Sequence, residues 1–293
     1  MLASRIADVR RDEPMAEHTS FKVGGCADLM ALPAEEDEIR HVLITARALG
    51  CPLYVTGRGT NLLVTSKGLR GIVLKLAENF SGMTFEGADL YAKSGTPLAV
   101  LVREATARCL GGAEFLGGIP GTLGGAVCMN AGAYGGEISD FVQEVDACSW
   151  AGDLTFSAQE MAFGYRCSLL SSYPLIVTGV RLRFLPCNEK ESRQKLLELN
   201  EKRREKQPLE YPSAGSTFKR PEGGFAGTLI EQAGLKGTRI GGAEVSDKHA
   251  GFVINKDGAT PEDIIALIKL VQARVHEAFG VALEPEVKII GEP

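Results

Sequence analysis

Apolar and polar positions alternate with two different periods, which predicts a protein of mixed helices and strands. Near the N-terminus, apolar runs at 29–32 and 53–55 predict strands. Between them, proline and acidic residues near Pro33 predict a helix start and Gly50 predicts its end. One apolar stripe of this helix is expected to be buried: Ile39, Val42, Leu43 and Ala46.

The pattern continues with short strands and one more helix up to residue 184. A strand is expected at 71–76, a hairpin at 84–92 with its turn near Gly87, and a helix at 96–110. Short alternating runs from Val142 to Phe184 predict antiparallel strands.

After Pro186 the composition changes, because residues 188–207 are charged and helical in pattern and end before Pro208. Beyond them we expect a short helix at 228–233, a strand at 251–254 and a terminal strand at 281–290. The clearest helix lies between, since Thr260, Pro261 and Asp263 form a start signal and Gly280 a stop.

A chain of 293 residues is too long for one ordinary core. We therefore expect two domains, 1–186 and 187–293. The first is expected to contain subdomains of about 1–76 and 77–186.

Composition narrows the class of protein. The net charge is −5 and no long run of like charge occurs, which argues against a nucleic-acid partner. No stretch reaches the length of a membrane span and the N-terminus has no apolar signal core, so we expect a cytoplasmic protein. The seven cysteines and four histidines show no metal-ligand spacing, which predicts reduced thiols and no metal site.

Two glycine-rich loops are candidate ligand sites. The first directly follows the strand at 53–55, where α/β proteins bind nucleotides, and its glycines would let backbone N–H groups approach a diphosphate. A tight strand connection is the alternative, since neither the dinucleotide fingerprint nor a Walker motif is present. The candidate residues are Gly57, Arg58, Gly59, Thr60, Asn61 and Leu62.

The second loop contains five glycines within nine residues. A flexible linker is the alternative, but apolar residues such as Ile119 and Leu123 need burial, which favours an ordered loop around a flat ligand. The candidate residues are Gly117, Gly118, Ile119, Pro120, Gly121, Thr122, Gly124 and Gly125.

Residues 211–219 are expected to form a turn whose shape depends on Gly215. The turn presents Ser216 between hydroxyl groups and Lys219, which suggests a proton donor held in a fixed position. An ordinary exposed turn is the alternative, because Pro, Ser and Gly are common in chain reversals.

Six motifs in order along nearly the whole chain resemble those of the UDP-N-acetylenolpyruvoylglucosamine reductases: residues 19–25, 57–63, 117–125, 164–166, 215–219 and 283–287. The resemblance implies an α+β fold with a two-subdomain FAD-binding unit of the vanillyl-alcohol-oxidase type and a C-terminal α+β substrate-binding domain. The terminal strand, 281–293, is expected to pack back near the flavin. No histidine lies within 57–63, so the FAD is expected to be non-covalent.

The resemblance also implies a reaction. NADPH reduces FAD and leaves, and the enolpyruvyl sugar nucleotide then takes the hydride to become UDP-N-acetylmuramate, a peptidoglycan precursor. Matched positions imply that Arg166 stabilises the enolate-like charge, that Ser216 protonates the adjacent carbon and that Glu286 assists beside the reacting carbons. A structural ion pair and an outward strand position are the alternatives for Arg166 and Glu286.

The substrate diphosphate needs cations, and the resemblance favours Arg203, Lys206 and Lys219, with Tyr165 beside them. A solvated helix face is the alternative for Arg203 and Lys206. Only about 20 residues separate Arg166 from Pro186, so the chain resembles the shorter type without an extra tyrosine-bearing loop.

Two other functions remain open from the sequence. An FAD-dependent oxidase of the same superfamily would explain both glycine loops but not the pairing of Ser216 with Glu286. A catalytically silent nucleotide-sugar-binding module is the second. We expect a monomer whose partners are small molecules.

Overall fold

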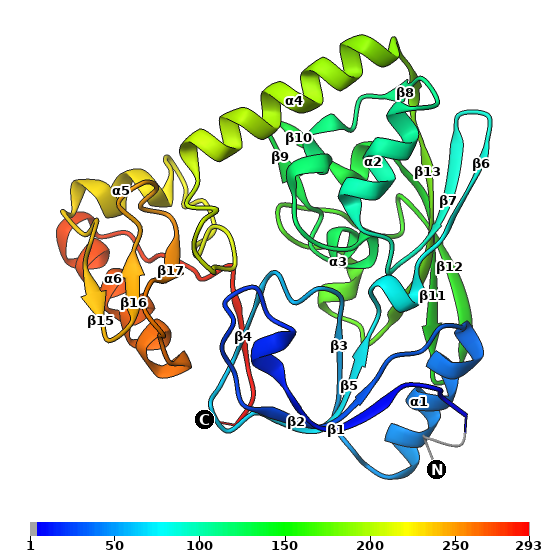
Figure 1. The fold of residues 1–293 in the computed structure, drawn as a ribbon, viewed down its shortest axis with the longest axis horizontal. Coiled ribbons are helices and arrows are strands. Elements are labelled where there is room, and N and C mark those ends of the chain that lie inside the picture. The colour runs from blue at the N-terminus through cyan, green and yellow to red at the C-terminus, as the bar shows by residue number, and fades with distance from the viewer. Residues whose placement is uncertain (1–4, 293) are drawn as a thin grey trace. The chain divides into compact units, whose positions relative to one another are not determined.

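The computed structural model describes residues 5–292, which form two compact units (Figure 1). The chain passes between the units several times, so neither is one continuous segment. The first unit contains the chain up to Arg11, Leu29–Arg58 and Gly71–Arg203, and the second contains Asp12–Asp28, Gly59–Arg70 and the chain from Arg204 onward.

A four-stranded sheet has the order β1-β2-β5-β3, and α1 lies beside its first-unit portion. The strands are β1 (Val9–Pro14), β2 (Cys26–Ala31), β5 (Leu69–Lys75) and β3 (Leu53–Thr56), and the helix is α1 (Glu36–Ala48). The predicted stripe of α1 is buried at Ile39, Val42 and Ala46, and it packs against Ile72 and Leu74 of β5. The predicted strand, helix and strand are confirmed.

The start of α1 differs from the sequence prediction. Glu35, rather than a residue next to Pro33, is the N-cap, and its side chain and that of Glu38 form a reciprocal capping box. A carboxylate at this position accepts from the first backbone N–H groups and complements the helix dipole. The cap therefore determines the helix start.

A second, five-stranded sheet forms the largest part of the first unit. Its order is β12-β11-β13-β7-β6, and every adjacent pair is antiparallel, as the alternation predicted. The strands are β12 (Gly152–Ser157), β11 (Val142–Ser149), β13 (Ile176–Arg183), β7 (Asp89–Lys93) and β6 (Met83–Glu86).

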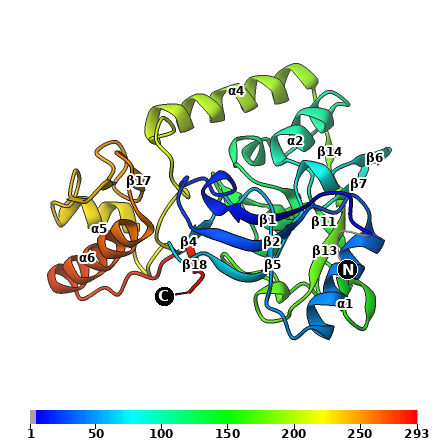
Figure 2. The same ribbon diagram turned by 60° about the horizontal axis from the view of Figure 1, so that its bottom comes forward.

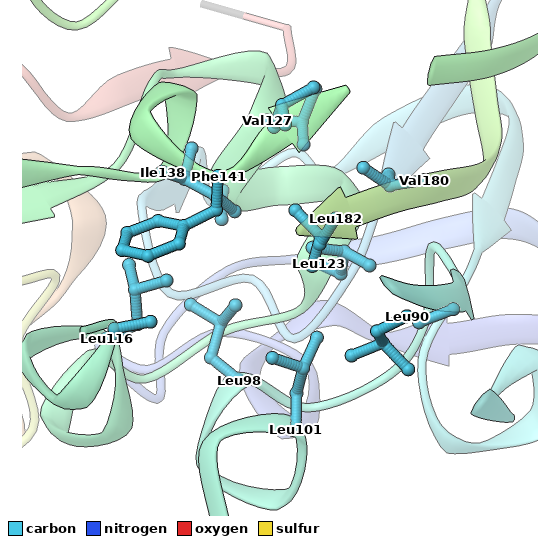
Figure 3. Packing of buried hydrophobic residues seen from close by; sticks show 14 of the residues in the cluster. Leu90, Leu98, Leu101, Leu116, Leu123, Val127, Ile138, Phe141, Val180 and Leu182 are labelled. Atoms are coloured by element: carbon cyan, nitrogen blue, oxygen red, sulfur yellow. The ribbon is translucent and has the colours of Figure 1, made fainter. Parts of the chain in front are cut away.

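Two short helices, α2 (Leu98–Thr106) and α3 (Leu123–Cys128), supply apolar side chains to the same core as this sheet. Figure 3 shows Leu98 and Leu101 of α2 with Leu123 and Val127 of α3 near Leu182 of β13. The predicted helix at 96–110 is shorter than expected, because residues 107–109 form a turn and Leu110 begins β8 (Leu110–Gly111), which pairs with β14 (Leu185–Pro186). A further small pair is β9 (Gly132–Ala133) with β10 (Gly136–Glu137).

The long helix α4 (Glu189–Lys206) belongs mostly to the first unit. Leu196 and Leu199 pack against the core that α2 and α3 share with the sheet. The units therefore divide after Arg203, whereas the sequence prediction placed a domain boundary at Pro186. The difference arises because two leucines on a charged helix are enough to fix it to one core.

The second unit contains a three-stranded sheet of order β15-β16-β17 with two helices. Its elements are β15 (Arg239–Ile240), β16 (Ala243–Val245), β17 (Val253–Asn255), α5 (Ala226–Gln232) and α6 (Pro261–Phe279). Helix α6 begins and ends as predicted: Thr260 accepts from the N–H of Asp263, and Gly280 takes a left-handed φ of 69°.

The terminal segment forms a much shorter strand than predicted. Only β18 (Lys288–Ile290) is regular, and it pairs in parallel with β4 (Leu62–Val64), so that Lys288 lies opposite Leu62. Both views show these two strands side by side (Figures 1 and 2). The end of the chain therefore lies beside the strand that follows the first glycine loop.

Candidate active site

The first glycine loop follows β3, and β3 runs parallel to β5. Within residues 5–292, the backbone N–H groups of Gly57, Arg58 and Gly59 donate to no protein atom. Such adjacent free donors at the carboxyl end of a parallel strand suit an anion. The Arg58 side chain is exposed and bonds Glu78, with Nε 2.8 Å from Oε1.

Gly59 cannot be replaced without strain. Its φ is +63°, and a Cβ added there would collide with the carbonyl oxygen of His18. The Gly59 carbonyl also accepts from the N–H of Ser20 at 3.2 Å. The motif at 19–25 therefore supports the back of the loop, within the second unit.

The second glycine loop leads into α3 and meets the first loop inside the first unit. A Cβ on Gly57 would collide with the Thr122 hydroxyl, so the two backbones approach closely. The loop is held by a turn before α2: Gly124 N–H donates to Ser94 O at 2.7 Å, and Leu123 N–H donates to the Thr96 carbonyl at 2.9 Å. The two loops therefore lie against each other at Gly57 and Thr122.

The glycines of the second loop have different roles. A Cβ on Gly117 would lie 2.5 Å from Leu196 Cδ1, and one on Gly118 would lie 2.9 Å from Asn200 Oδ1, so these two glycines admit α4. A Cβ on Gly125 would make only an ordinary contact, 3.7 Å from Thr122 Oγ1, so packing does not require glycine there. The residue is also exposed, so its backbone is accessible.

The remaining loop residues are distributed between packing and backbone contacts. Ile119 packs against the core, Gly121 accepts from the N–H of Leu98 at 3.3 Å, and Leu62 begins β4. Thr60 and Pro120 each have further contacts within the described chain. Free amide donors at one loop and an open glycine backbone at the other fit a cofactor that carries phosphates and a flat ring, as FAD does.

The serine turn and the terminal segment are joined by backbone hydrogen bonds. Glu286 N–H donates to Thr217 O at 2.8 Å, and Lys219 N–H donates to Glu284 O at 2.9 Å. Ser216 is exposed and Glu286 is half-buried. Two of the predicted catalytic residues, 70 positions apart, are therefore held in one short ladder.

Thr217 fixes this ladder to the rest of the second unit. It is fully buried, its N–H donates to Gly251 O at 2.8 Å, and its hydroxyl accepts from Val253 N–H at 2.9 Å. Gly215, just before the serine, has a φ of +77° with no atom near an added Cβ, so its glycine is needed for conformation only.

Arg166 lies in the first unit, at the tip of a tight turn. The turn is closed by reciprocal bonds between Gly164 and Cys167, at 3.1 and 3.2 Å, and Arg166 has a φ of 55°. Its guanidinium donates to two carbonyl oxygens, Gly132 at 3.0 Å and Asn130 at 3.4 Å. These two bonds orient the guanidinium.

The four residues predicted to contact the substrate differ in burial and in their partners. Arg203 is half-buried beside Gly118, and burial lowers its pKa because the guanidinium loses hydration. Lys219 is paired with Glu284 at 2.5 Å, and Lys206 is exposed. Tyr165 is 47% exposed, and the guanidinium carbon of Arg166 lies 5.1 Å from its ring centroid.

Two residues near the site were missed by the sequence reasoning. Asn130 is buried and donates to Glu137 at 2.7 Å and to Gly164 O at 3.1 Å, which holds the Arg166 turn. Thr217 lies inside a motif that drew attention only to its neighbour. An asparagine or threonine among apolar and glycine residues is the one signal that could have indicated such buried hydrogen bonds.

Among residues 5–292, no three His, Cys, Asp or Glu side chains gather in a way that could hold a metal ion. No helix in that part of the chain is both long and apolar enough to span a bilayer.

Comparison with known families identifies the class of protein. Residues 27–156 match the FAD binding domain family, and residues 207–290 match the C-terminal domain of UDP-N-acetylenolpyruvoylglucosamine reductase. The chain is therefore an FAD-dependent oxidoreductase with an α+β fold, as predicted.

Similar proteins identify the family. The chain is 49% identical to a UDP-N-acetylenolpyruvoylglucosamine reductase of Caldanaerobacter subterraneus subsp. tengcongensis, over 96% of this chain and 93% of that protein. It is 46% identical to one of Syntrophomonas wolfei, over 97% and 95%. The crystal structure of such a reductase from Thermus caldophilus superposes with a TM-score of 0.83 at 34% identity, covering 96% and 98%. The chain belongs to the UDP-N-acetylenolpyruvoylglucosamine reductase family.

The predicted activity follows from this membership. The enzyme reduces UDP-N-acetylglucosamine enolpyruvate with FAD as cofactor and NADPH as co-substrate, in peptidoglycan precursor synthesis. The match along nearly the whole chain favours the reductase over both alternatives, the oxidase and the silent binding module.

Proposed function

We propose that Ser216, Arg166 and Glu286 carry out the second half of this reaction, in which the enolpyruvyl group accepts a hydride and then a proton. Bound FAD supplies the hydride. The ladder that joins Glu286 N–H to Thr217 O, at 2.8 Å, is the observation that most supports this proposal. It holds a carboxylate and a hydroxyl from distant parts of the sequence on one rigid piece of backbone.

Arg166 stabilises negative charge on the substrate carboxylate as the hydride arrives. A fixed cation is most effective where charge develops in the transition state, because it needs no reorganisation at that moment. The bonds from its guanidinium to Gly132 O and Asn130 O support this role, since they fix the position of the guanidinium.

Ser216 donates the proton to the adjacent carbon. A hydroxyl is a weak acid, so it serves only against a strongly basic carbanion and only when it is well placed. Its turn is held by Thr217 and given its shape by Gly215, which supports such placement. Glu286 assists at the same carbons, by polarising the enolpyruvyl group or relaying a proton.

Both glycine loops bind FAD without a covalent bond. The residues involved are Gly57, Arg58, Gly59, Thr60, Asn61 through its backbone, Leu62, Gly117, Gly118, Ile119, Pro120, Gly121, Thr122, Gly124 and Gly125. The free N–H groups of the first loop and the open side of Gly125 support this assignment, whereas Gly117 and Gly118 contribute through the packing of α4.

Tyr165, Arg203, Lys206 and Lys219 bind the UDP-sugar substrate. The burial of Arg203 beside Gly118 supports a role in ligand binding, because a guanidinium that is partly removed from water attracts a bound anion more strongly. We also propose that the enzyme is a cytoplasmic monomer that binds no nucleic acid, in line with its net charge of −5.

Ser216→Ala tests the proposal. The purified protein should be yellow and should bleach anaerobically with NADPH at the wild-type rate, because the serine has no part in the first half-reaction. Re-oxidation by the enolpyruvyl sugar nucleotide should be slower by about 100-fold or more. Stopped-flow absorbance of the flavin measures both steps separately.

Ser213→Ala is the matched control, since this residue lies in the same turn and should leave both rates unchanged. A Ser216→Ala enzyme that is re-oxidised at the wild-type rate would contradict the proposed proton donor. Equal slowing of both half-reactions would contradict the division of roles.

A further inference from the structure

We propose that Asn61 is a positioning residue for Glu286: its side chain holds the backbone of the glutamate against the first glycine loop rather than binding the cofactor. This assignment rests on the proposed role of Glu286 and adds a residue to that site. The sequence alone placed Asn61 among the cofactor ligands.

Two hydrogen bonds carry the inference. The Asn61 side-chain amide donates from Nδ2 to Glu286 O at 3.0 Å, and the Asn61 carbonyl accepts from Lys288 N–H at 3.0 Å. Both lie within the second unit. One asparagine therefore bonds the terminal segment on either side of Val287, which is itself buried.

Further backbone hydrogen bonds hold the terminal segment on both sides of the Asn61 contacts. Immediately after Asn61, β4 pairs in parallel with β18, from Leu62 opposite Lys288 onward. Immediately before the Asn61 contact, Glu286 N–H donates to Thr217 O at 2.8 Å. Both backbone polar groups of Glu286 are thus bonded, one to the serine turn and the other to the glycine loop.

The chemistry requires this arrangement to be held closely. Side chains that act on one reacting carbon must keep their positions, and a displacement of about 1 Å can cost on the order of 100-fold in rate. The backbone at 284–287 is irregular and is not fixed by a long ladder of strand hydrogen bonds. The Asn61 amide holds it in place instead. One N–H of this amide is bonded to the Glu286 carbonyl, which assigns the side chain to the terminal segment.

Asn61→Asp is the first test, because it keeps the shape of the side chain and removes the donor. The variant should retain FAD and be reduced by NADPH within about twofold of the wild-type rate, whereas re-oxidation by the enolpyruvyl substrate should slow by about 10- to 100-fold. Asn61→Ala should give the same pattern, and it serves if the aspartate variant folds poorly.

Gln272→Glu is the matched control. The Gln272 side-chain amide donates to Leu283 O at 2.8 Å, so this variant makes the same chemical change on the same terminal segment, three residues before Glu286. Both half-reactions should keep their wild-type rates. Equal slowing in this control would show that any loosening of the segment is sufficient and would overturn the specific role of Asn61.

A double-mutant cycle distinguishes the role of Glu286 from that of Asn61. Glu286→Gln should slow re-oxidation by itself, and adding Asn61→Asp should slow it little further, since the residues act through one another. If Glu286→Gln has no effect, the proposed function of the glutamate fails. If Glu286→Gln slows the step and the two effects multiply, or if Asn61→Asp instead loses FAD, the positioning role is wrong and the function of Glu286 stands.

Discussion

At the scale of single residues, the glycines of the two loops are required for different physical reasons. Gly59 combines a left-handed φ with a neighbouring carbonyl, so both the conformation and the space exclude a side chain. Gly125 is restricted by neither packing nor a positive φ in the protein itself. A substitution can therefore separate glycines that fold the loop from glycines that admit a ligand.

We expect Gly59→Ala to destabilise the protein by more than about 1 kcal/mol and to weaken FAD binding, because the loop must move away from His18. Gly50→Ala is the control: its φ is +60°, but nothing lies within 4 Å of an added Cβ. Gly50→Ala should reduce the free energy of unfolding by about 1 kcal/mol and leave FAD binding unchanged. Urea unfolding and flavin titration measure the two effects, and equal affinities for FAD would contradict the prediction.

His249 should make stability depend on pH. Burial lowers its pKa, and its Nδ1 accepts from the N–H of Gly251 at 3.1 Å, which requires the neutral ring. Below the ordinary histidine pKa of about 6.5, the unfolded chain binds a proton that the folded chain does not. The free energy of unfolding should therefore fall as the pH decreases from that value.

The measurement is urea unfolding from about pH 5 to about pH 7.5, for the wild type and for His249→Gln. The difference in unfolding free energy between the two should grow steadily more favourable to the variant as the pH falls. A constant difference over this range would exclude His249 as the source.

The residue scale also shows what sequence reasoning can reach. Ser216, Arg166 and Glu286 were selected because each lies in a short motif, and six such motifs occur in order along the chain. The bond from Asn61 to Glu286 spans 225 positions, and no local pattern encodes such a partner. Propensity and spacing act over a few residues, whereas this bond depends on the complete fold.

At the scale of elements, the helix with the strongest local signals was predicted best. The cap at Thr260 and the stop at Gly280 fix α6 within a residue of the expected range. The terminal strand was overestimated, because residues 281–287 are apolar enough for a strand but pair only through isolated contacts. Helix α4 lies mostly in the first compact unit, whereas the sequence prediction placed it after the domain boundary, since its charge conceals the two leucines that attach it.

The contact between α4 and the second glycine loop can be tested by Gly117→Ala. The new Cβ would lie 2.5 Å from Leu196 Cδ1, and this overpacking should reduce the free energy of unfolding by about 1–3 kcal/mol. Leu196→Ala should relieve this overpacking. The double variant should therefore be more stable, by on the order of 1 kcal/mol, than the sum of the two single effects predicts. Leu197→Ala, at a position 58% exposed, should give no coupling.

Thermal or urea unfolding of the four proteins measures the cycle. Additive effects of Gly117→Ala and Leu196→Ala would show that the loop can shift away from the helix without cost, and that the glycine is present for some other reason.

At the scale of the whole molecule, the second unit depends on segments from three parts of the chain. Phe21, Val23 and Leu63 are buried in the same core as the helices α5 and α6, and β4 supplies the only regular partner of β18 within residues 5–292. Although residues 207–290 match a C-terminal domain by themselves, that core is incomplete without the earlier segments.

We therefore expect a fragment of residues 204–293 to be poorly folded. It would lack three large buried side chains, and exposing their partners removes roughly 1.5–3 kcal/mol of hydrophobic stabilisation for each. Circular dichroism should show no cooperative melting for the fragment, whereas the full chain should melt cooperatively. A sharp transition in the fragment would show that the last ninety residues form a core without help.

The interleaved path has a consequence for cleavage by proteases. The backbone crosses between the units after Arg11, Asp28, Arg58, Arg70 and Arg203, which makes five covalent links. A protease that cuts one of them leaves the halves tethered by the other four. Nicked enzyme should therefore migrate as one native particle, and its fragments should separate only in denaturant.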